Sequence, residues 1–169
     1  MEASQSWPQL IEPILAKNTP IRKVINASIS GDTTGNGLER LPELLKLHQP
    51  NWILIELGAN DGLRGFPIKT IEKNLDSLIR ISQENNVKTM LMQIQAPPNY
   101  GKRYSRSFYN MYLNASKKFD VPLLPFFLEQ VILKKAWMMK DGLHPTAAAQ
   151  PWIANYIAKE MTPYLNGSK

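Results

Sequence analysis

The sequence predicts a single α/β domain in which a parallel sheet carries helices on both faces. Apolar runs of strand length alternate along the chain with segments of helical period. These runs are apolar almost throughout, which is typical of parallel strands that are covered on both faces. We find no internal repeat, low-complexity tract or linker, so we expect one domain over residues 1–169.

The predicted strands are short apolar runs between turn-forming residues. They are Val24–Ile29, Trp52–Leu57, Thr89–Ile94 and Val121–Phe126. The predicted helices are Trp7–Lys17, Leu38–His48, Ile71–Asn85, Arg106–Phe119 and Ala147–Leu165, and the pattern around Leu128–Lys135 also allows a short helix. The third of these helices places Ile71, Leu75, Leu78 and Ile79 on one stripe, which we expect to be buried.

Composition excludes several classes of protein. Hydrophobic residues make up 43% of the chain and charged residues 20%, as in ordinary globular proteins. The absence of cysteine excludes disulfides, thiolate metal sites and a cysteine nucleophile. No apolar run approaches the ~20 residues that span a bilayer. The segment Met1–Trp7 lacks the basic and apolar regions of a signal peptide.

The net charge of +6 leaves open a partner that is acidic, such as nucleic acid or anionic lipid. The basic residues are scattered, however, and none of them interleaves with aromatic residues as a nucleic-acid platform would. We therefore expect a solvated basic surface and no nucleic-acid partner. The short basic pairs are Arg22-Lys23, Lys102-Arg103, Lys117-Lys118 and Lys134-Lys135.

Asp141 and His144 stand three residues apart, just before the last predicted helix. At this spacing the carboxylate can accept a hydrogen bond from one ring nitrogen and leave the other nitrogen free as a base. The same residues could instead cap a helix, or His144 could be a buried, hydrogen-bonded histidine. This motif alone does not decide between a catalytic and a structural role.

Two other loops follow predicted strands, where α/β folds bind their ligands. In Gly58–Gly62, the Asn60 amide is a neutral donor that can face a developing oxyanion. In Ser28–Thr33, Gly31 lets the backbone approach a ligand closely and offers its N–H group. Each loop could also be a plain turn. The three motifs nevertheless stand in order on successive loops, and their joint arrangement favours a functional site.

Read in this order, Ser-Gly-Asp at 30–32, Gly-Ala-Asn-Asp at 58–61 and Asp-Gly-Leu-His-Pro at 141–145 resemble the second, third and fifth blocks of the SGNH (GDSL-type) hydrolases. The resemblance covers nearly all of the chain and implies a flavodoxin-like, three-layer α/β/α fold. It also implies hydrolysis of acyl esters and thioesters without a cofactor or metal. Further segments resemble the bacterial thioesterase I, lysophospholipase and arylesterase subgroup, namely Asn26–Thr33, Glu56–Phe66, Met92–Tyr104 and Asp120–Phe127.

The resemblance implies a role for four residues. His144 would be the general base, and Asp141 would orient it. Asn60 would supply its side-chain amide to the oxyanion hole, and Gly31 its backbone N–H. Each role suits the residue type that would perform it.

The first block of the family, an apolar strand followed by Gly-Asp-Ser-Leu, has no counterpart in the sequence. We therefore expect a domain that is truncated at its N-terminus and lacks the nucleophilic serine. Gly31-Asp32-Thr33 does not replace this block, because the preceding strand and the distance to Gly58 place it as the second block. We interpret Ser28 and Ser30 as turn residues. Met1 resembles an internal methionine of a longer protein, because relatives approach the first helix through a Gly-Tyr-Gly-Met-like run.

The missing strand belongs in the middle of the family's sheet, whose strand order is 2-1-3-4-5. Without it, Val24–Ile29 would have no neighbour, and each unpaired buried backbone group costs about 1–3 kcal/mol. Domains are stable by only about 5–15 kcal/mol. We therefore expect either a marginally stable domain or a direct pairing of Val24–Ile29 with Trp52–Leu57.

Two loops are expected to flank the substrate. Gly62–Pro67 mixes glycines with apolar side chains, as a flexible cover would, and Ala96–Gly101 could form a stiffer wall. Both could equally be ordinary connecting loops. Our hypothesis is a shallow apolar groove for medium or long acyl groups. The residues expected to contact the substrate are Leu63, Phe66, Pro97, Asn99 and Tyr100.

The leading hypothesis is therefore a serine hydrolase of acyl esters and thioesters in its full-length form, with little activity in the chain as given. The alternative is a noncatalytic acyl-binding relative that has lost its nucleophile, although the retention of Gly31, Asn60, Asp141 and His144 argues against it. A nucleic-acid-binding module is supported only by the net charge. We expect a monomer with a small-molecule substrate and no stable membrane insertion, and relatives of this subgroup are commonly periplasmic.

Overall fold

The computed structural model describes residues 5–96 and 98–167, which divide into two compact units. The first, here called the sheet unit, is Ser28–Leu124. The second, here called the terminal unit, combines Met1–Ala27 with Pro125–Lys169. The two units are described separately below. Within the described residues, no helix combines the length and apolar character that crossing a membrane requires.

The sheet unit contains three parallel strands in the order β1-β2-β3. They are β1 (Trp52–Ile55), β2 (Lys88–Met92) and β3 (Leu123–Leu124). The central strand β2 is buried from Thr89 to Met92, in keeping with its continuous apolar sequence. Three of the four predicted strands therefore form, each shorter than its apolar run.

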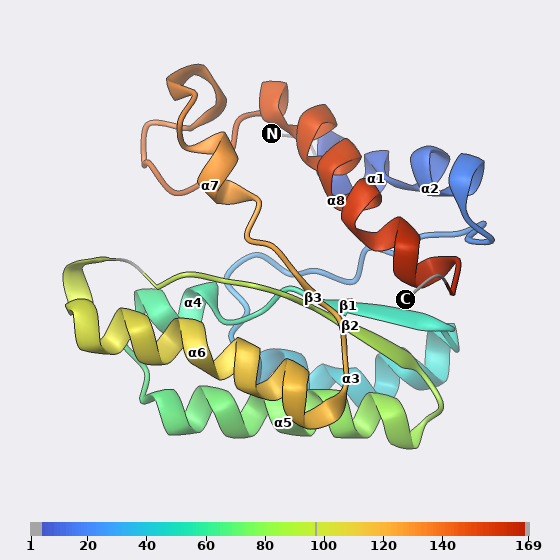
Figure 1. Ribbon diagram of the computed structural model, residues 1–169, viewed down its shortest axis with the longest axis horizontal. Coiled ribbons are helices and arrows are strands. Elements are labelled where there is room, and N and C mark those ends of the chain that lie inside the picture. The colour runs from blue at the N-terminus through green and yellow to red at the C-terminus, as the bar shows by residue number, and fades with distance from the viewer. Residues whose placement is uncertain (1–4, 97, 168–169) are drawn as a thin grey trace. The chain divides into compact units, whose positions relative to one another are not determined.

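The helices of the sheet unit run along one side of its strands in Figure 1. The long ones are α3 (Thr34–His48), α5 (Ile68–Glu84) and α6 (Lys102–Phe119). The predicted stripe on α5 is confirmed, since Ile71, Leu75, Leu78 and Ile79 are all buried. Two short elements complete the unit, α4 (Ala59–Leu63) and η2 (Pro98–Tyr100).

Helix α3 begins four residues before the predicted start at Leu38, because Thr33 caps it. The Thr33 hydroxyl accepts a hydrogen bond from the Asn36 N–H, and the Asn36 side chain accepts one from the Thr33 N–H. This reciprocal capping box satisfies two backbone donors that a helix start otherwise leaves unpaired. It also fixes the end of the loop that carries Gly31.

The terminal unit is helical. It contains α1 (Trp7–Leu10), α2 (Glu12–Asn18), α7 (Leu128–Val131), η3 (Lys135–Trp137), η4 (Ala147–Ala149) and α8 (Gln150–Leu165). A segment near the N-terminus is bonded here to the start of α8, since the Trp7 N–H donates to Gln150 Oε1 at 2.9 Å. The predicted helix Trp7–Lys17 is broken at Ile11, because Pro13 cannot donate a backbone hydrogen bond and disfavours continuous helix before it.

The predicted strand Val24–Ile29 is wrong, and its direct pairing with Trp52–Leu57, one of the two outcomes that we considered, does not form. Residues 21–29 have no regular secondary structure, and the side chains of Ile25 and Ile29 are exposed. Among the described residues, β1 has β2 as its only strand neighbour. An apolar run becomes a strand only when a neighbour accepts its hydrogen bonds, and Val24 instead donates its N–H to the Glu12 carboxylate at 2.7 Å.

Candidate active site

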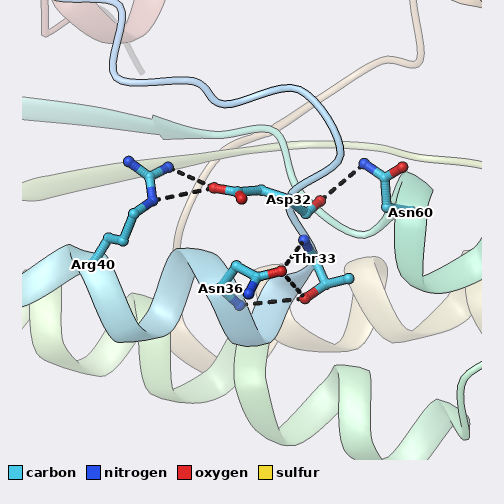
Figure 2. A network of polar contacts seen from close by, with 5 residues as sticks. All are labelled: Asp32, Thr33, Asn36, Arg40 and Asn60. Carbon is cyan, nitrogen blue, oxygen red and sulfur yellow. Dashed lines mark hydrogen bonds and ion pairs between the residues drawn. The ribbon is translucent and has the colours of Figure 1, made fainter.

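The loops after residue 29 and after β1 are joined at Asn60, as Figure 2 shows. Asn60 Nδ2 donates to the backbone oxygen of Asp32 at 2.9 Å, which places its amide beside the loop of Gly31. This bond also orients the amide, because only the NH₂ end can donate. One amide hydrogen is used in the bond, and the second remains for another acceptor. Gly31 has φ of 88°, a backbone conformation that favours glycine.

Arg40 secures the same loop from helix α3 (Figure 2). Its guanidinium donates twice to Asp32 Oδ2, from Nε at 3.1 Å and from Nη2 at 2.7 Å. The Asp32 residue thus binds Arg40 through its carboxylate and Asn60 through its carbonyl oxygen. Arg64 adds a contact to this loop, from Nη2 to the Gly31 oxygen at 3.3 Å. The backbone around Gly31 is therefore held from α3, α4 and the residue after α4.

Asp61, the neighbour of Asn60, is fully buried and binds the start of α3. Its carboxylate accepts from the Thr34 N–H at 2.9 Å and from the Thr34 hydroxyl at 2.5 Å. Asn74 of α5 donates to the same hydroxyl at 3.1 Å. A buried carboxylate is tolerated only when its oxygens are hydrogen-bonded. These bonds connect α4 to two helices and so fix the segment that carries Asn60.

An aromatic ladder that begins in η2 and continues along one face of α6 supports the loop after β1. It consists of Tyr100, Tyr104, Phe108 and Tyr112, and its successive ring centroids lie 5.3, 6.0 and 5.7 Å apart. The Tyr112 hydroxyl donates to the Leu57 oxygen at 2.7 Å. Gly58 has φ of 115°, and a Cβ there would lie 2.0 Å from that hydroxyl. The loop therefore requires glycine at this position.

The ladder also holds the segment that was predicted to cover the substrate. The Tyr100 hydroxyl donates to the Leu63 oxygen at 2.7 Å, and the Tyr104 hydroxyl donates to the Phe66 oxygen at 2.8 Å. Leu63, Asn99 and Tyr100 are exposed, as substrate-contacting residues must be, and Pro97 lies outside the described residues. A shallow depression of about 340 Å³ lies beside Tyr100, and it is lined by Ile68, Tyr100, Arg103, Tyr104 and Ser107.

The Glu56 carboxyl, just after the C-terminal end of β1, is half-buried, and its desolvation raises its pKa to about 7. Desolvation disfavours the charged form of a carboxyl group, which accounts for the direction of the shift. Glu56 was not predicted as a functional residue. Its position, four residues before Asn60, places an ionisable group close in sequence to the predicted oxyanion donor.

Asp141 and His144 form the predicted pair in the terminal unit. Asp141 Oδ2 lies 2.8 Å from His144 Nδ1, while Oδ1 accepts from the N–H groups of Leu143 and His144 at 2.9 and 3.1 Å. The His144 side chain, the Leu143 N–H and the His144 N–H, in that order, lower the Asp141 pKa to about 2. The carboxylate thus stays ionised at neutral pH and leaves His144 Nε2 as the acceptor for a proton.

The structure brings the four predicted catalytic residues together as two pairs, one in each unit. Gly31 and Asn60 lie on joined loops of the sheet unit, and Asp141 and His144 are hydrogen-bonded in the terminal unit. Sequence reasoning assigned no role to Arg40 or Asp61, and none to Tyr104 or Tyr112, while it predicted Tyr100 as a substrate contact. A signal existed for the ladder, because its aromatic residues recur every four positions from 100 to 112.

Comparison with known proteins identifies relatives of this chain. The arylesterase of Vibrio mimicus is 53% identical over 165 residues, which cover 98% of this chain and 82% of that protein. The thioesterase 1/protease 1/lysophospholipase L1 of Escherichia coli K12 is 50% identical, over 98% of this chain and 78% of that protein. These relatives confirm the predicted resemblance to esterases and thioesterases of this subgroup.

A solved structure of the psychrotrophic esterase EstA from Pseudoalteromonas, inhibited by monoethylphosphonate, superposes with a TM-score of 0.93 at 41% identity. The match covers 98% of this chain and 90% of that one. This likeness confirms the predicted fold class, a three-layer α/β/α fold with a parallel sheet. Residues 2–150 match the family described as GDSL-like lipase/acylhydrolase. Because the family model matches most of the chain and two relatives are 53% and 50% identical to it, the chain belongs to the GDSL-like lipase/acylhydrolase family.

Proposed function

We propose that these residues serve an enzyme that hydrolyses carboxylic esters and thioesters of acyl groups, with His144 as the base and with Gly31 and Asn60 as oxyanion donors. The observation that carries the proposal is the bond between Asn60 Nδ2 and the Asp32 oxygen, because it fixes a donor before any substrate arrives. Preorganised donors of this kind supply a large part of the rate enhancement in acyl transfer. Family membership and the names of the relatives support the same chemistry.

In the proposed mechanism, a serine hydroxyl attacks the acyl carbon, and its proton passes to His144 Nε2. Asp141 keeps the ring oriented through Nδ1 and stabilises the imidazolium that forms. The developing oxyanion accepts hydrogen bonds from the Gly31 N–H and the second hydrogen of Asn60 Nδ2. The imidazolium then protonates the leaving alcohol or thiol, and water releases the acid from the acyl-enzyme. We assign the serine to the family's Gly-Asp-Ser-Leu block, a sequence that does not occur in residues 1–169.

For the substrate, we propose a medium or long acyl chain that lies on the surface around Leu63, Phe66 and Tyr100. The exposed Leu63 and Tyr100 side chains support this proposal, as does the shallow depression beside Tyr100. We further propose that the protein is a periplasmic monomer, on the pattern of its subgroup. Preference for an acetyl ester over the octanoyl ester of the same alcohol would contradict the acyl assignment.

The test uses hydrolysis of p-nitrophenyl octanoate by the product of the complete reading frame that contains these residues. We expect His144→Ala to lower kcat by about 10⁴-fold or more, and Asn60→Ala to lower it by about 10²–10³-fold. The matched controls are His48→Ala, at the only other histidine, and Asn114→Ala, at an exposed asparagine of α6. Equal losses in the controls would contradict the assignment.

A second arm measures the 169-residue chain alone. We expect turnover close to that of the buffer. Robust turnover that His144→Ala abolishes would show that a residue within this chain, such as Ser30, acts as the nucleophile, and the assignment of the serine to another block would be wrong. The upstream coding DNA provides an independent check, since an in-frame Gly-Asp-Ser-Leu after an apolar run is expected there.

A further inference from the structure

The segment 131–146 of the terminal unit, here called the lysine hairpin, runs from the end of α7 through η3 into a hairpin at residues 137–146. Met138 and Pro145 form an antiparallel bridge, and the Thr146 N–H donates to the Trp137 oxygen at 2.7 Å. Closer to the tip, the Met139 N–H donates to the His144 oxygen at 2.8 Å. These backbone bonds fix the paired residues 137–146.

The lysine hairpin exposes large apolar side chains. Ile132, Leu133, Met139 and Leu143 are all exposed, and the exposed fraction of Leu133 reaches 77%. Single exposed apolar residues are common on protein surfaces, but a concentration in one short ordered segment is typical of an interaction site. Met139 and Leu143 lie in the paired part, and Ile132 and Leu133 lie in the turn after α7. The N–H groups of Ile132 and Lys134 donate to the Leu128 and Val131 oxygens at 2.9 and 3.0 Å, so this turn is ordered as well.

The same hairpin carries a positive charge. It contains Lys134, Lys135 and Lys140, and its only acidic residue is Asp141, which is paired with His144. Lys134 Nζ lies 3.8 Å from the centroid of the Trp137 ring, so its ammonium group is held next to the apolar surface. Such a combination of apolar side chains and lysines matches the surface of an anionic lipid bilayer, where charged head groups cover the hydrocarbon.

We propose that the lysine hairpin is a docking surface for anionic lipid bilayers. A second copy of the chain is a poorer occupant, because a symmetric contact would bring the same lysines face to face. An anionic lipid surface offers both head groups for the lysines and hydrocarbon for Ile132 and Leu133. Docking there would bring His144, at the tip of the hairpin, to the surface that holds acyl lipids. That consequence rests on the proposed function, whereas the docking itself needs no chemistry.

The experiment measures co-sedimentation of the chain with vesicles of phosphatidylcholine alone and of phosphatidylcholine mixed with phosphatidylglycerol. We expect binding only to the mixed vesicles, weakened by added salt, because the attraction of surface charges is screened. The double variant Leu133→Ser, Lys135→Gln removes one apolar and one charged group of the patch. It should bind at least about fivefold more weakly, because a single lysine near an anionic membrane surface contributes about that factor to the affinity.

The matched control is Leu47→Ser, Lys46→Gln on α3, where Leu47 has a similar exposed fraction of 70%. It makes the same change in net charge and should bind within about twofold of the unmodified chain, because it leaves the hairpin intact. Equal weakening by both double variants would overturn the proposal in favour of net charge alone. The proposal would also fall if the unmodified chain failed to bind the mixed vesicles, or if it formed dimers that the hairpin variant dissociates.

Because sedimentation is independent of turnover, the two proposals fail separately. A chain that binds vesicles through the hairpin but whose reading frame yields no esterase would refute only the proposed function. An active esterase without vesicle binding would refute only the docking surface.

Discussion

The two units hold their predicted catalytic groups in opposite ways. In the sheet unit, the loops of Gly31 and Asn60 are fixed by side chains from several elements, among them the buried Asp61. In the terminal unit, Asp141 and His144 are exposed and bind one another within four residues. The difference suits the two tasks, since oxyanion donors must be rigid beforehand, whereas a base must reach and exchange protons.

The largest expected effect on stability comes from replacing the buried Asp61, and the exposed Asp141 provides the comparison. Asp61→Ala leaves the Thr34 N–H and hydroxyl without their buried acceptor and should lower the free energy of unfolding by about 3 kcal/mol. Asp141→Ala removes an exposed carboxylate whose partners lie within three residues, so it should lower the urea midpoint much less than Asp61→Ala. Urea denaturation followed by circular dichroism measures both. Similar losses in the two variants would break the contrast between the units.

The second prediction concerns pH, because the two units shift carboxyl pKa values in opposite directions. The Glu56 pKa rises from 4.5 to about 7, so the folded state binds more protons than the unfolded state between these values. Stability should therefore fall as pH rises from 4.5 through 7, by roughly 2–3 kcal/mol in total. Glu56→Gln should abolish this decline in urea denaturation series.

The Asp141 carboxyl provides the contrast to Glu56, because it titrates at low pH. The Asp141 pKa is lowered from 3.8 to about 2, so its contribution is complete above pH 3.8 and is lost as pH falls through about 2. A carbon-13 titration of the two carboxyl groups by NMR would therefore show midpoints on either side of the ordinary range. Midpoints near pH 4 for both carboxyl groups would contradict the predicted shifts of their pKa values.

The smallest expected effect tests how the oxyanion loop is held. Arg40→Gln removes a partly exposed ion pair and should cost only about 1 kcal/mol of stability. It should nevertheless shift the side-chain amide resonances of Asn60, because Asp32 joins both residues. Arg40→Lys should restore part of the shift, and Arg80→Gln, at an exposed arginine of α5, should cause none. Unchanged Asn60 resonances in Arg40→Gln would show that the ion pair does not position the amide.

Local patterns predicted the molecule better than patterns that depend on distant partners. The α5 stripe and the Asp141–His144 pair were predictable, because spacings of three and four residues determine which side chains meet. The strand Val24–Ile29 was not, since an apolar run does not reveal whether a neighbouring strand exists. The bonds of Asp61 to Thr34 join residues 27 positions apart, and no local spacing indicates them.

The aromatic ladder has a consequence for how often residues 63–66 can change shape. Displacing this segment breaks the phenol bonds of Tyr100 and Tyr104 to its carbonyl oxygens. At about 1 kcal/mol for each bond, the displaced conformer would be populated at only a few per cent. A ligand that requires that conformer would bind about thirtyfold more weakly than its contacts alone would allow. The hydroxyls of Tyr100 and Tyr104 would thus set the free energy that is needed to displace residues 63–66.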